Sequence, residues 1–243
     1  MKIIPCTQLS ANWFQAHCGV VSGSSMGAVL DFTQKGAPGS KRRTYFRTKL
    51  AELLTGVAIQ DNYVSKEMLE GIEREPLAIA AYERQEGVMC EEIGFALHDV
   101  IPRFGCSPDR LVGKDGLVEA KCPKAGTHLQ WVLDGCIPAE HLPQLRAELS
   151  VTGRDWVDFV SFCPEVPKPL QLMVIRFERS QADLEPLERA VMDFNAEIAG
   201  AVEKLRGIAG PFDLPAQVLA TEQKEDSILA ETYLTDEEIA KYI

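Results

Sequence analysis

The chain has 243 residues, 46% of them hydrophobic, which is enough for one domain with a substantial core. It contains no apolar run of membrane-spanning length, its N-terminus is too short and mixed for a signal peptide, and its seven cysteines form no Cys-x-x-Cys pair. These features argue against a membrane protein and against zinc or iron–sulfur centres, and they favour a reducing cytoplasm.

The first part of the chain is predicted to contain an irregular lead-in at residues 1–12 and helices that begin at Ser24 and span 43–55 and 65–86. Serine is a favoured N-cap residue, and glycine at Gly56 is a favoured helix end. Pro76 lies inside the third helix, whose apolar residues recur at three- and four-residue spacing. Proline removes a backbone donor, so we expect it to kink or divide that helix.

Strands dominate the middle of the chain, at residues 88–90, 95–98, 103–112, 116–122, 156–163 and 170–177, with helices at 140–152 and 180–206. Trp131 is expected in a loop between them. This order predicts an α/β or α+β domain over residues 1–206, with a central mixed β-sheet flanked by helices. Residues 207–243 predict an appendage, either loosely packed or in contact with a subunit or partner, and Thr235 to Glu238 has a capping-box pattern that predicts a short helix.

The most informative motif is Asp109 followed ten residues later by Glu119-Ala120-Lys121. Asp115-Gly116 lies between the two halves and predicts a hairpin turn. Side chains alternate between the faces of a strand, so Glu119 and Lys121 share one face, within reach of Asp109. The two carboxylates suit Mg²⁺, or Mn²⁺ as a substitute, with the backbone carbonyl of Ala120 as a further hard ligand. A surface hairpin with scattered charges remains the alternative.

These residue types suit hydrolysis of a phosphodiester. A divalent ion held by Asp109 and Glu119 would neutralise phosphate charge and activate a water molecule. Lys121 would orient that water or stabilise charge in the transition state.

Further motifs stand in a consistent order along residues 12–200: Trp13 to Ser24, Thr44-Tyr45-Phe46, Gly71 to Glu75, Cys106 to Asp109, Glu119 to Pro123, and Pro143-Gln144-Leu145. In this set the chain resembles the phage lambda-type exonucleases, the YqaJ-like viral recombinase family of the PD-(D/E)xK nuclease superfamily. The resemblance implies a restriction-endonuclease-like core. It also implies a catalytic set of Glu75, Asp109, Glu119 and Lys121 with Gln144 nearby, in which Glu75 contacts the metal directly or indirectly.

The same resemblance places Ser24 and Ser107 near a pocket for a 5′-phosphate. His17 stands where the family has an arginine. Histidine is only partly charged near neutral pH, so we expect a preference for 5′-phosphorylated ends that weakens as the pH rises.

A basic cluster precedes and enters the helix predicted at 43–55, and its members are Lys41, Arg42, Arg43 and Arg47. We expect these residues to contact the DNA backbone, because phosphate contacts dominate affinity for DNA. A solvated loop is the alternative. The formal net charge of −11 then requires an acidic outer surface around a basic DNA channel.

The resemblance implies a Mg²⁺-dependent 5′→3′ exonuclease that digests one strand of linear double-stranded DNA and leaves 3′ tails for strand-annealing recombination. It further implies a homotrimeric ring, a single-strand annealing protein as partner, and a phage or prophage protein in the bacterial cytoplasm. The alternatives are an end-independent restriction or repair endonuclease of the same superfamily, and a non-catalytic module that binds DNA ends or a recombinase.

Overall fold

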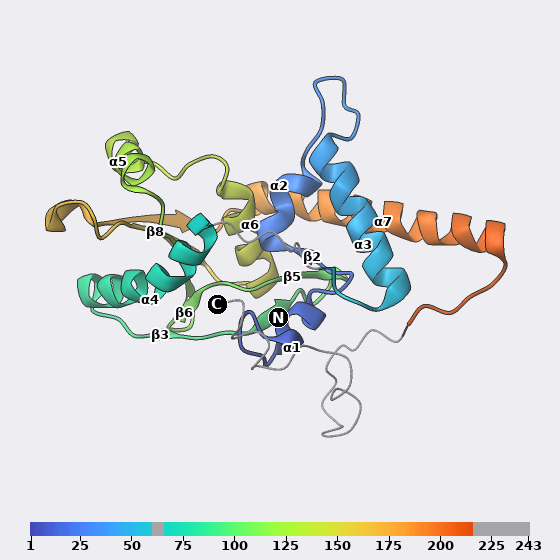
Figure 1. Cartoon of the computed structure of the whole chain (residues 1–243), viewed down its shortest axis with the longest axis horizontal. Helices are drawn as coiled ribbons and strands as arrows, with labels where there is room; N and C mark the ends of the chain where they lie inside the picture. Colours follow the sequence, from blue (N-terminus) through green and yellow to red (C-terminus); the bar gives the residue numbers. More distant parts are fainter. Residues whose placement is uncertain (60–65, 216–243) are drawn as a thin grey trace.

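The computed structural model describes residues 1–59 and 66–215. It is a mixed α/β fold in which helices flank the sheets, as predicted (Figure 1). The capping-box helix predicted near Thr235 lies outside the described residues.

The larger sheet of the described residues has the order β3 (Cys90–Glu91), β6 (Arg110–Val112), β7 (Gly116–Lys121), β8 (Trp156–Phe162) and β9 (Leu172–Glu178). β7 and β8 run parallel, and the other neighbours are antiparallel. The smaller sheet has the order β1 (Lys2–Ile4), β4 (Phe95–Leu97), β5 (Phe104–Cys106) and β2 (Val21–Ser22). In this sheet β2 and β5 run parallel, so both sheets are mixed.

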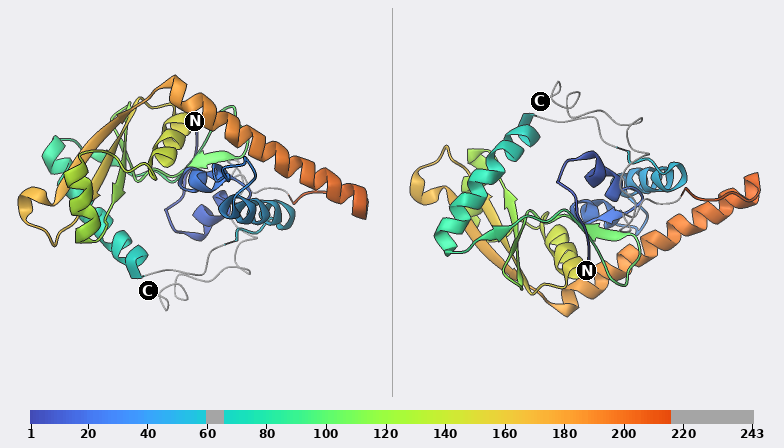
Figure 2. Two further views of the ribbon diagram at one scale, coloured as in Figure 1. Left: turned by 90° about the horizontal axis from the view of Figure 1, so that it is seen from above. Right: turned by 90° about the horizontal axis from the view of Figure 1, so that it is seen from below.

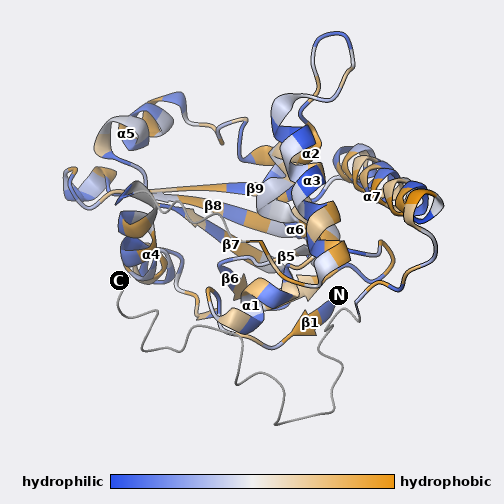
Figure 3. Ribbon diagram, turned by 45° about the vertical axis from the view of Figure 1, so that its right-hand side comes forward, coloured by the Kyte–Doolittle hydropathy of each residue, from blue (hydrophilic) through white to orange (hydrophobic). Residues whose placement is uncertain are grey.

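The helices are α1 (Ala11–Ala16), α2 (Met26–Val29), α3 (Ser40–Thr55), α4 (Lys66–Glu86), α5 (Ala125–Asp134), α6 (Leu142–Thr152) and α7 (Gln181–Ala209), with short 3₁₀ turns at Gly23–Ser25 and Lys168–Leu170. α4 contacts β7, β8 and β9, whereas α6 contacts β8, the smaller sheet and α7. α7 is the long helix that projects beyond the body, beside α3 (Figure 2). Polar and apolar bands alternate along it (Figure 3), and the apolar ones supply core residues such as Phe194.

Alternation along β7 divides the core into two parts. Leu117 packs in the cluster shared with α6 and α7, whereas Val118 packs with Ile79 and Tyr82 of α4. Burial of these side chains is the main stabilising contribution, at roughly 25 cal/mol per Å² of apolar surface. The sheet is therefore held between α4 on one face and α6 with α7 on the other.

Several predicted elements differ from the structure. The expected lead-in contains β1 and α1, and the segment around Trp131, expected to be a loop, is α5. The strand predicted at 103–112 is two strands, because Pro108 has no N–H for a sheet ladder. α4 is not divided at Pro76, which lies on its exposed side. Buried Ile79 and Tyr82 hold the following turns against the sheet.

The predicted boundary after residue 206 stays a prediction. α7 runs to Ala209, and Phe212 and Leu214 pack against the main core cluster. No helix of the described ranges combines the length and the apolar character that a bilayer crossing requires.

Candidate active site

Residues of the predicted catalytic set line one cavity of about 230 Å³. Glu75 comes from α4, Asp109 from the loop after β5, Glu119 and Lys121 from β7, and Gln144 from α6. The remaining lining residues are Gln8, Leu9, Trp13, His17, Ser22, Gly23, Ser24, Ile72, Cys106, Ser107 and Glu148. The fold therefore brings together residues that are up to 140 positions apart in the sequence, from Gln8 to Glu148.

β7 presents Glu119 and Lys121 on the face that α6 covers, as the alternation of its side chains predicted. Lys121 Nζ lies 2.5 Å from Glu119 Oε1, and Gln144 Nε2 donates to the same oxygen over 2.6 Å. The Glu119 side chain is only 3% exposed. Burial by itself would lower the pKa of Lys121, but the Glu119 and Asp109 carboxylates raise it above its ordinary value. Lys121 is therefore an ammonium ion at physiological pH.

Asp109 is fixed to β7 by its side chain. Its Oδ2 accepts a hydrogen bond of 2.7 Å from the backbone N–H of Ala120. Burial raises the pKa of Asp109 well above its ordinary value, and the charges of Glu119 and Glu75 raise it further. A bound cation would stabilise the ionised form of this buried carboxyl, so Asp109 is suited to be a metal ligand. The contribution of the Ala120 carbonyl as a ligand stays a prediction.

Glu75 reaches the cavity from α4, where it pairs with Arg110 Nη1 over 3.2 Å. Burial raises its pKa, the charge of Arg110 opposes that shift, and the charge of Glu119 adds to it. Arg110 was not singled out in the sequence. The signal available was its position next to Asp109 at the start of a strand.

Glu148 is a second residue that sequence reasoning missed. It is 1% exposed, and Gln144 Nε2 donates to its Oε1 over 2.9 Å. Burial and the nearby charge of Glu119 raise its pKa well above the ordinary value. The available signal was its spacing: Glu148 follows Gln144 by four residues, so both lie on one face of α6.

The donor set of the cavity fits a divalent cation. Glu119 Oε2 and Glu148 Oε2 are both buried and accept no hydrogen bond within the described part of the chain. In the same part of the chain, no three acidic, histidine or cysteine side chains lie close enough together to coordinate one metal ion. The other Glu119 oxygen, Oε1, pairs with Lys121 Nζ. Unpartnered carboxylate oxygens in an acidic, partly dry cavity are hard ligands of the kind that Mg²⁺ and Mn²⁺ prefer.

Residues predicted to read the 5′ end also line this cavity. His17 Nδ1 lies 2.8 Å from the carbonyl oxygen of Trp13, and Trp13 Nε1 donates to Ser107 Oγ over 2.9 Å. Ser24 is exposed at the cavity. Burial lowers the pKa of His17 to about 4, so the ring is neutral from pH 6.5 to 9. The predicted preference for 5′-phosphorylated ends that weakens with rising pH stays a prediction, because a phosphate dianion beside His17 would raise this pKa.

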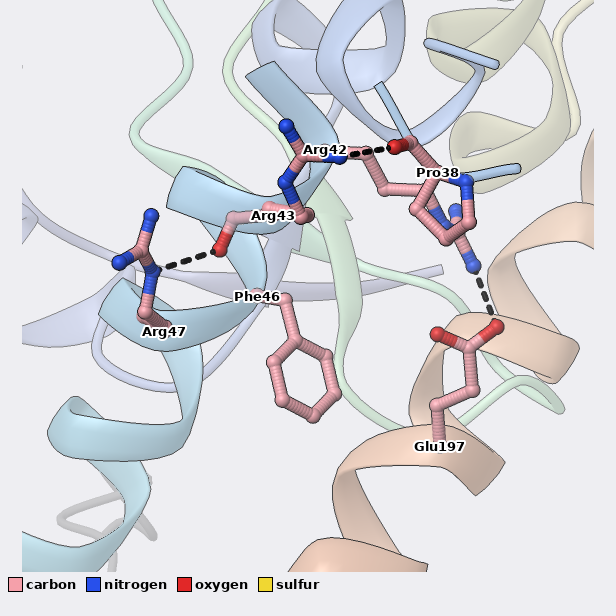
Figure 4. Close-up of a pocket in the computed structure, with 6 residues that line it drawn as sticks. All are labelled: Pro38, Arg42, Arg43, Phe46, Arg47 and Glu197. Atoms are coloured by element: carbon pink, nitrogen blue, oxygen red, sulfur yellow. Dashed lines mark hydrogen bonds and ion pairs between the residues drawn. The ribbon is translucent and has the colours of Figure 1, made fainter. Parts of the chain in front are cut away.

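The basic cluster belongs to α3 and has buried and exposed members. Figure 4 shows its three arginines, with Arg42 directed toward Glu197 of α7. Arg42 is 2% exposed, donates to the Val29 carbonyl and pairs with Glu197 over 2.6 Å. Its burial does not fit the predicted contact with DNA, because α7 already neutralises its charge. Lys41, Arg43 and Arg47 are exposed. Arg43 and Arg47 line, with Phe46, a separate cavity of about 600 Å³ between α3 and α7.

Comparisons with known proteins identify the family. The model of the YqaJ-like viral recombinase domain matches residues 12–155. The structure of an alkaline exonuclease, LHK-Exo from Laribacter hongkongensis, is 34% identical with a TM-score of 0.75, over 82% of this chain and 98% of that chain. The same enzyme in complex with dAMP gives the same values.

A phage-related exonuclease from Haemophilus somnus is 14% identical, with a TM-score of 0.61, over 76% of this chain and 96% of that chain. That likeness supports the fold alone. No curated protein matches the chain. The family model spans more than half of the sequence, and its match includes Glu75, Asp109, Glu119, Lys121, Gln144 and Glu148. The chain therefore belongs to the YqaJ-like viral recombinase family, and an alkaline exonuclease is among its structural relatives.

Proposed function

We propose that the protein is a Mg²⁺-dependent 5′→3′ exonuclease that digests one strand of linear double-stranded DNA and leaves 3′ single-stranded tails for strand-annealing recombination. The observation that carries this proposal is the convergence of Asp109, Glu119 and Lys121 in one cavity with Glu75 and Gln144. The likeness to an alkaline exonuclease that has been crystallised with dAMP supports it.

In this proposal Asp109 and Glu119 hold the cation, with the Ala120 carbonyl as a third ligand and Glu75 contributing directly or indirectly. A bound Mg²⁺, or Mn²⁺ in its place, would neutralise phosphate charge and lower the pKa of a water molecule. The side chains of the protein would position the cation and its ligands. Gln144 Nε2 holds Glu119 in one orientation, so the carboxylate does not have to reorganise when substrate binds.

Lys121 is the one ammonium group among the described residues that line the cavity. In the proposed reaction it orients the attacking water and stabilises negative charge on the phosphate in the transition state. The ion pair with Glu119 holds the ammonium at the cavity, and the Lys121 side chain is only 29% exposed. The Lys121–Glu119 pair would therefore couple metal binding to the placement of the cation that assists the reaction.

The exposed cations Lys41, Arg43 and Arg47 on α3 would contact the DNA backbone, which carries a large part of the affinity of DNA-binding proteins. We further propose a homotrimeric ring that surrounds the duplex, a single-strand annealing protein as partner, and a site of action in the cytoplasm of a bacterial host. An acidic outer surface with its cations facing DNA would reconcile this function with the formal net charge of −11.

The test is digestion of linear duplex DNA labelled at either the 5′ or the 3′ end, with Mg²⁺. A 5′→3′ exonuclease releases the 5′ label as mononucleotide first and retains the 3′ label on a shortening strand. A covalently closed circle is the matched control substrate and should stay intact. Cleavage of the circle would show an endonuclease instead. Tight binding of ends without any cleavage would show a non-catalytic module.

A further inference from the structure

The cavity between α3 and α7, called the α3 cavity here, carries positive charge that the described residues do not neutralise. It is lined by Arg43, Phe46 and Arg47, together with Pro38 (Figure 4). Arg43 Nη1 donates to the Pro38 carbonyl over 2.6 Å, and Arg47 Nε donates to the Arg43 carbonyl over 3.1 Å. Neither guanidinium pairs with a carboxylate in the described part of the chain, in contrast to Arg42. The α3 cavity is therefore suited to an anionic ligand.

The α3 cavity also has an apolar part. Phe46 is partly buried and packs edge-to-face against the Phe194 ring of α7, with a centroid separation of 6.0 Å. Carboxylates form strong, charge-assisted hydrogen bonds with guanidinium groups, and burial of apolar side chains against an aromatic ring adds stability. A peptide that alternates acidic and apolar side chains would match both parts of the cavity.

The sequence contains such a peptide directly after the described residues. Residues 216–243, called the acidic tail here, hold seven acidic residues and two lysines, a net charge of −5. Apolar residues stand between the acids, among them Ile228, Leu229, Tyr233 and Leu234. The acidic tail therefore has the composition that the α3 cavity would bind.

The acidic tail also begins beside α3. A Cβ atom placed on Gly56, directly after this helix, would lie 2.9 Å from Pro215 Cβ. At 1.5 Å per residue, Arg47 and Arg43 lie roughly 13 and 20 Å from Gly56 along the helix axis. Glu222, seven residues after Pro215, reaches at most roughly 24 Å from it. The acids of the tail can therefore reach both arginines of their own chain.

We propose that the acidic tail binds in the α3 cavity of its own chain, with carboxylates on Arg43 and Arg47 and an apolar side chain against Phe46. The tail and the DNA backbone would then compete for these two arginines. The competition rests on the proposed function, whereas the docking of the tail does not. A tether of this kind gives an effective concentration of roughly 1 mM. A tail with a dissociation constant of roughly 0.2 mM would therefore lower the affinity for DNA roughly sixfold.

The first test measures docking without DNA. A full-length variant, called the neutral-tail variant here, carries glutamine or asparagine in place of the seven acids, which are Glu222, Glu225, Asp226, Glu231, Asp236, Glu237 and Glu238. Its α3 cavity is free for a labelled peptide of residues 216–243, which should bind with a dissociation constant of roughly 0.2 mM. Fluorescence anisotropy in EDTA measures this binding.

Two further variants, made in the neutral-tail chain, locate the site of the peptide. Arg43→Gln with Arg47→Gln should weaken its binding at least roughly fivefold, since both charge-assisted contacts are lost. Lys114→Gln with Lys168→Gln is the matched control, because both lysines are exposed and neither lines the α3 cavity. It should leave peptide binding unchanged. Absence of binding, or equal binding to the two double variants, would overturn the docking.

The second test measures competition with duplex DNA by anisotropy in Ca²⁺, which does not require cleavage. At about 0.15 M salt, where distant charges are screened, the neutral-tail variant should bind roughly sixfold more tightly than the wild type. In the Arg43→Gln, Arg47→Gln background the same neutralisation should change affinity less than roughly twofold. Equal gains in both backgrounds would show a long-range charge effect and overturn the competition.

Two other outcomes separate the parts of the proposal. A gain that appears only as the protein concentration rises would assign the tail to a second copy of the chain and overturn docking within one chain. Peptide binding at the α3 cavity of a protein that neither binds nor cleaves duplex would support the docking while refuting the proposed function.

Discussion

Asp109 Oδ2 accepts a 2.7 Å hydrogen bond from the backbone N–H of Ala120, so a loop carboxylate is fixed to the strand that carries Glu119 and Lys121. Asp109→Asn keeps an oxygen that can accept this bond but cannot carry charge. We expect cleavage to fall at least roughly 100-fold, because a metal ligand worth several kcal/mol of transition-state stabilisation is lost. Initial rates on linear duplex with Mg²⁺ measure the effect.

The melting temperature of Asp109→Asn should not fall, since the burial of the ionised carboxyl is unfavourable. Asp115→Asn, at the exposed hairpin turn, is the matched control and should retain wild-type activity. Near-normal Mg²⁺-dependent cleavage by Asp109→Asn would remove Asp109 from the metal site. Loss of melting cooperativity would instead indicate a structural defect.

Lys121→Ala should act on the rate and not on DNA affinity. The ammonium assists the transition state, so we expect kcat to fall roughly 10²–10³-fold, as for lost charge-stabilising donors in other enzymes. Single-turnover rates and anisotropy in Ca²⁺ separate the two effects. Lys114→Ala, on the same hairpin and exposed, should change neither. A loss of affinity as large as the loss of rate would show that Lys121 binds phosphate in the ground state.

Stability without metal should fall as the pH rises. The pKa of Glu148 is raised in the folded protein by burial and by Glu119, whereas a glutamate in the unfolded chain titrates near about 4.3. The folded state therefore holds more protons between the two pKa values. The free energy of unfolding is highest below the unfolded pKa and decreases as the pH rises through the folded one.

Glu148→Gln should flatten this dependence, because the amide does not titrate. Glu185→Gln on the exposed side of α7 is the control and should keep the wild-type slope. Urea denaturation in EDTA at pH 5 to 9 measures the slope for each protein. An unchanged slope in Glu148→Gln would assign the pH dependence to other carboxylates, such as Asp109.

Substitutions of the α3 arginines should have two kinds of effect: one on stability and one on DNA binding. Arg42→Ala removes a guanidinium that is 2% exposed and leaves the Val29 carbonyl without its donor, so we expect a loss of roughly 1–3 kcal/mol in unfolding free energy. Arg43→Ala and Arg47→Ala, at exposed positions, should leave stability within roughly 0.5 kcal/mol.

The exposed substitutions should instead weaken duplex binding and reduce its salt dependence, with a slope change of roughly one per lost phosphate contact. Urea denaturation and anisotropy titrations at several salt concentrations give both quantities. Wild-type affinity and slope for both exposed variants would show that DNA does not contact this part of α3.

Local rules were sufficient for much of the candidate site. The spacing of Glu119 and Lys121 placed both on one strand face, because side-chain direction in a strand has a period of two. A hairpin between β6 and β7 is present as the Asp-Gly signal indicated, but its loop runs from Gly113 to Asp115, and Gly116 already pairs with Val112 in the sheet. The order of motifs was enough to indicate the family, since each motif is short and local.

Tertiary structure alone decided which polar groups are buried and which donors are already used. Arg42 and Arg43 are neighbours in a basic run, yet one is buried against Glu197 and the other is exposed. His17 is neutral because Trp13 and Phe95 enclose it, and Glu148 reaches the cavity because α6 packs on the face of β7 that carries Glu119. Whether a side chain is buried, and whether its hydrogen-bond donors already have partners, depends on residues distant in the chain. A local sequence pattern therefore cannot predict either property.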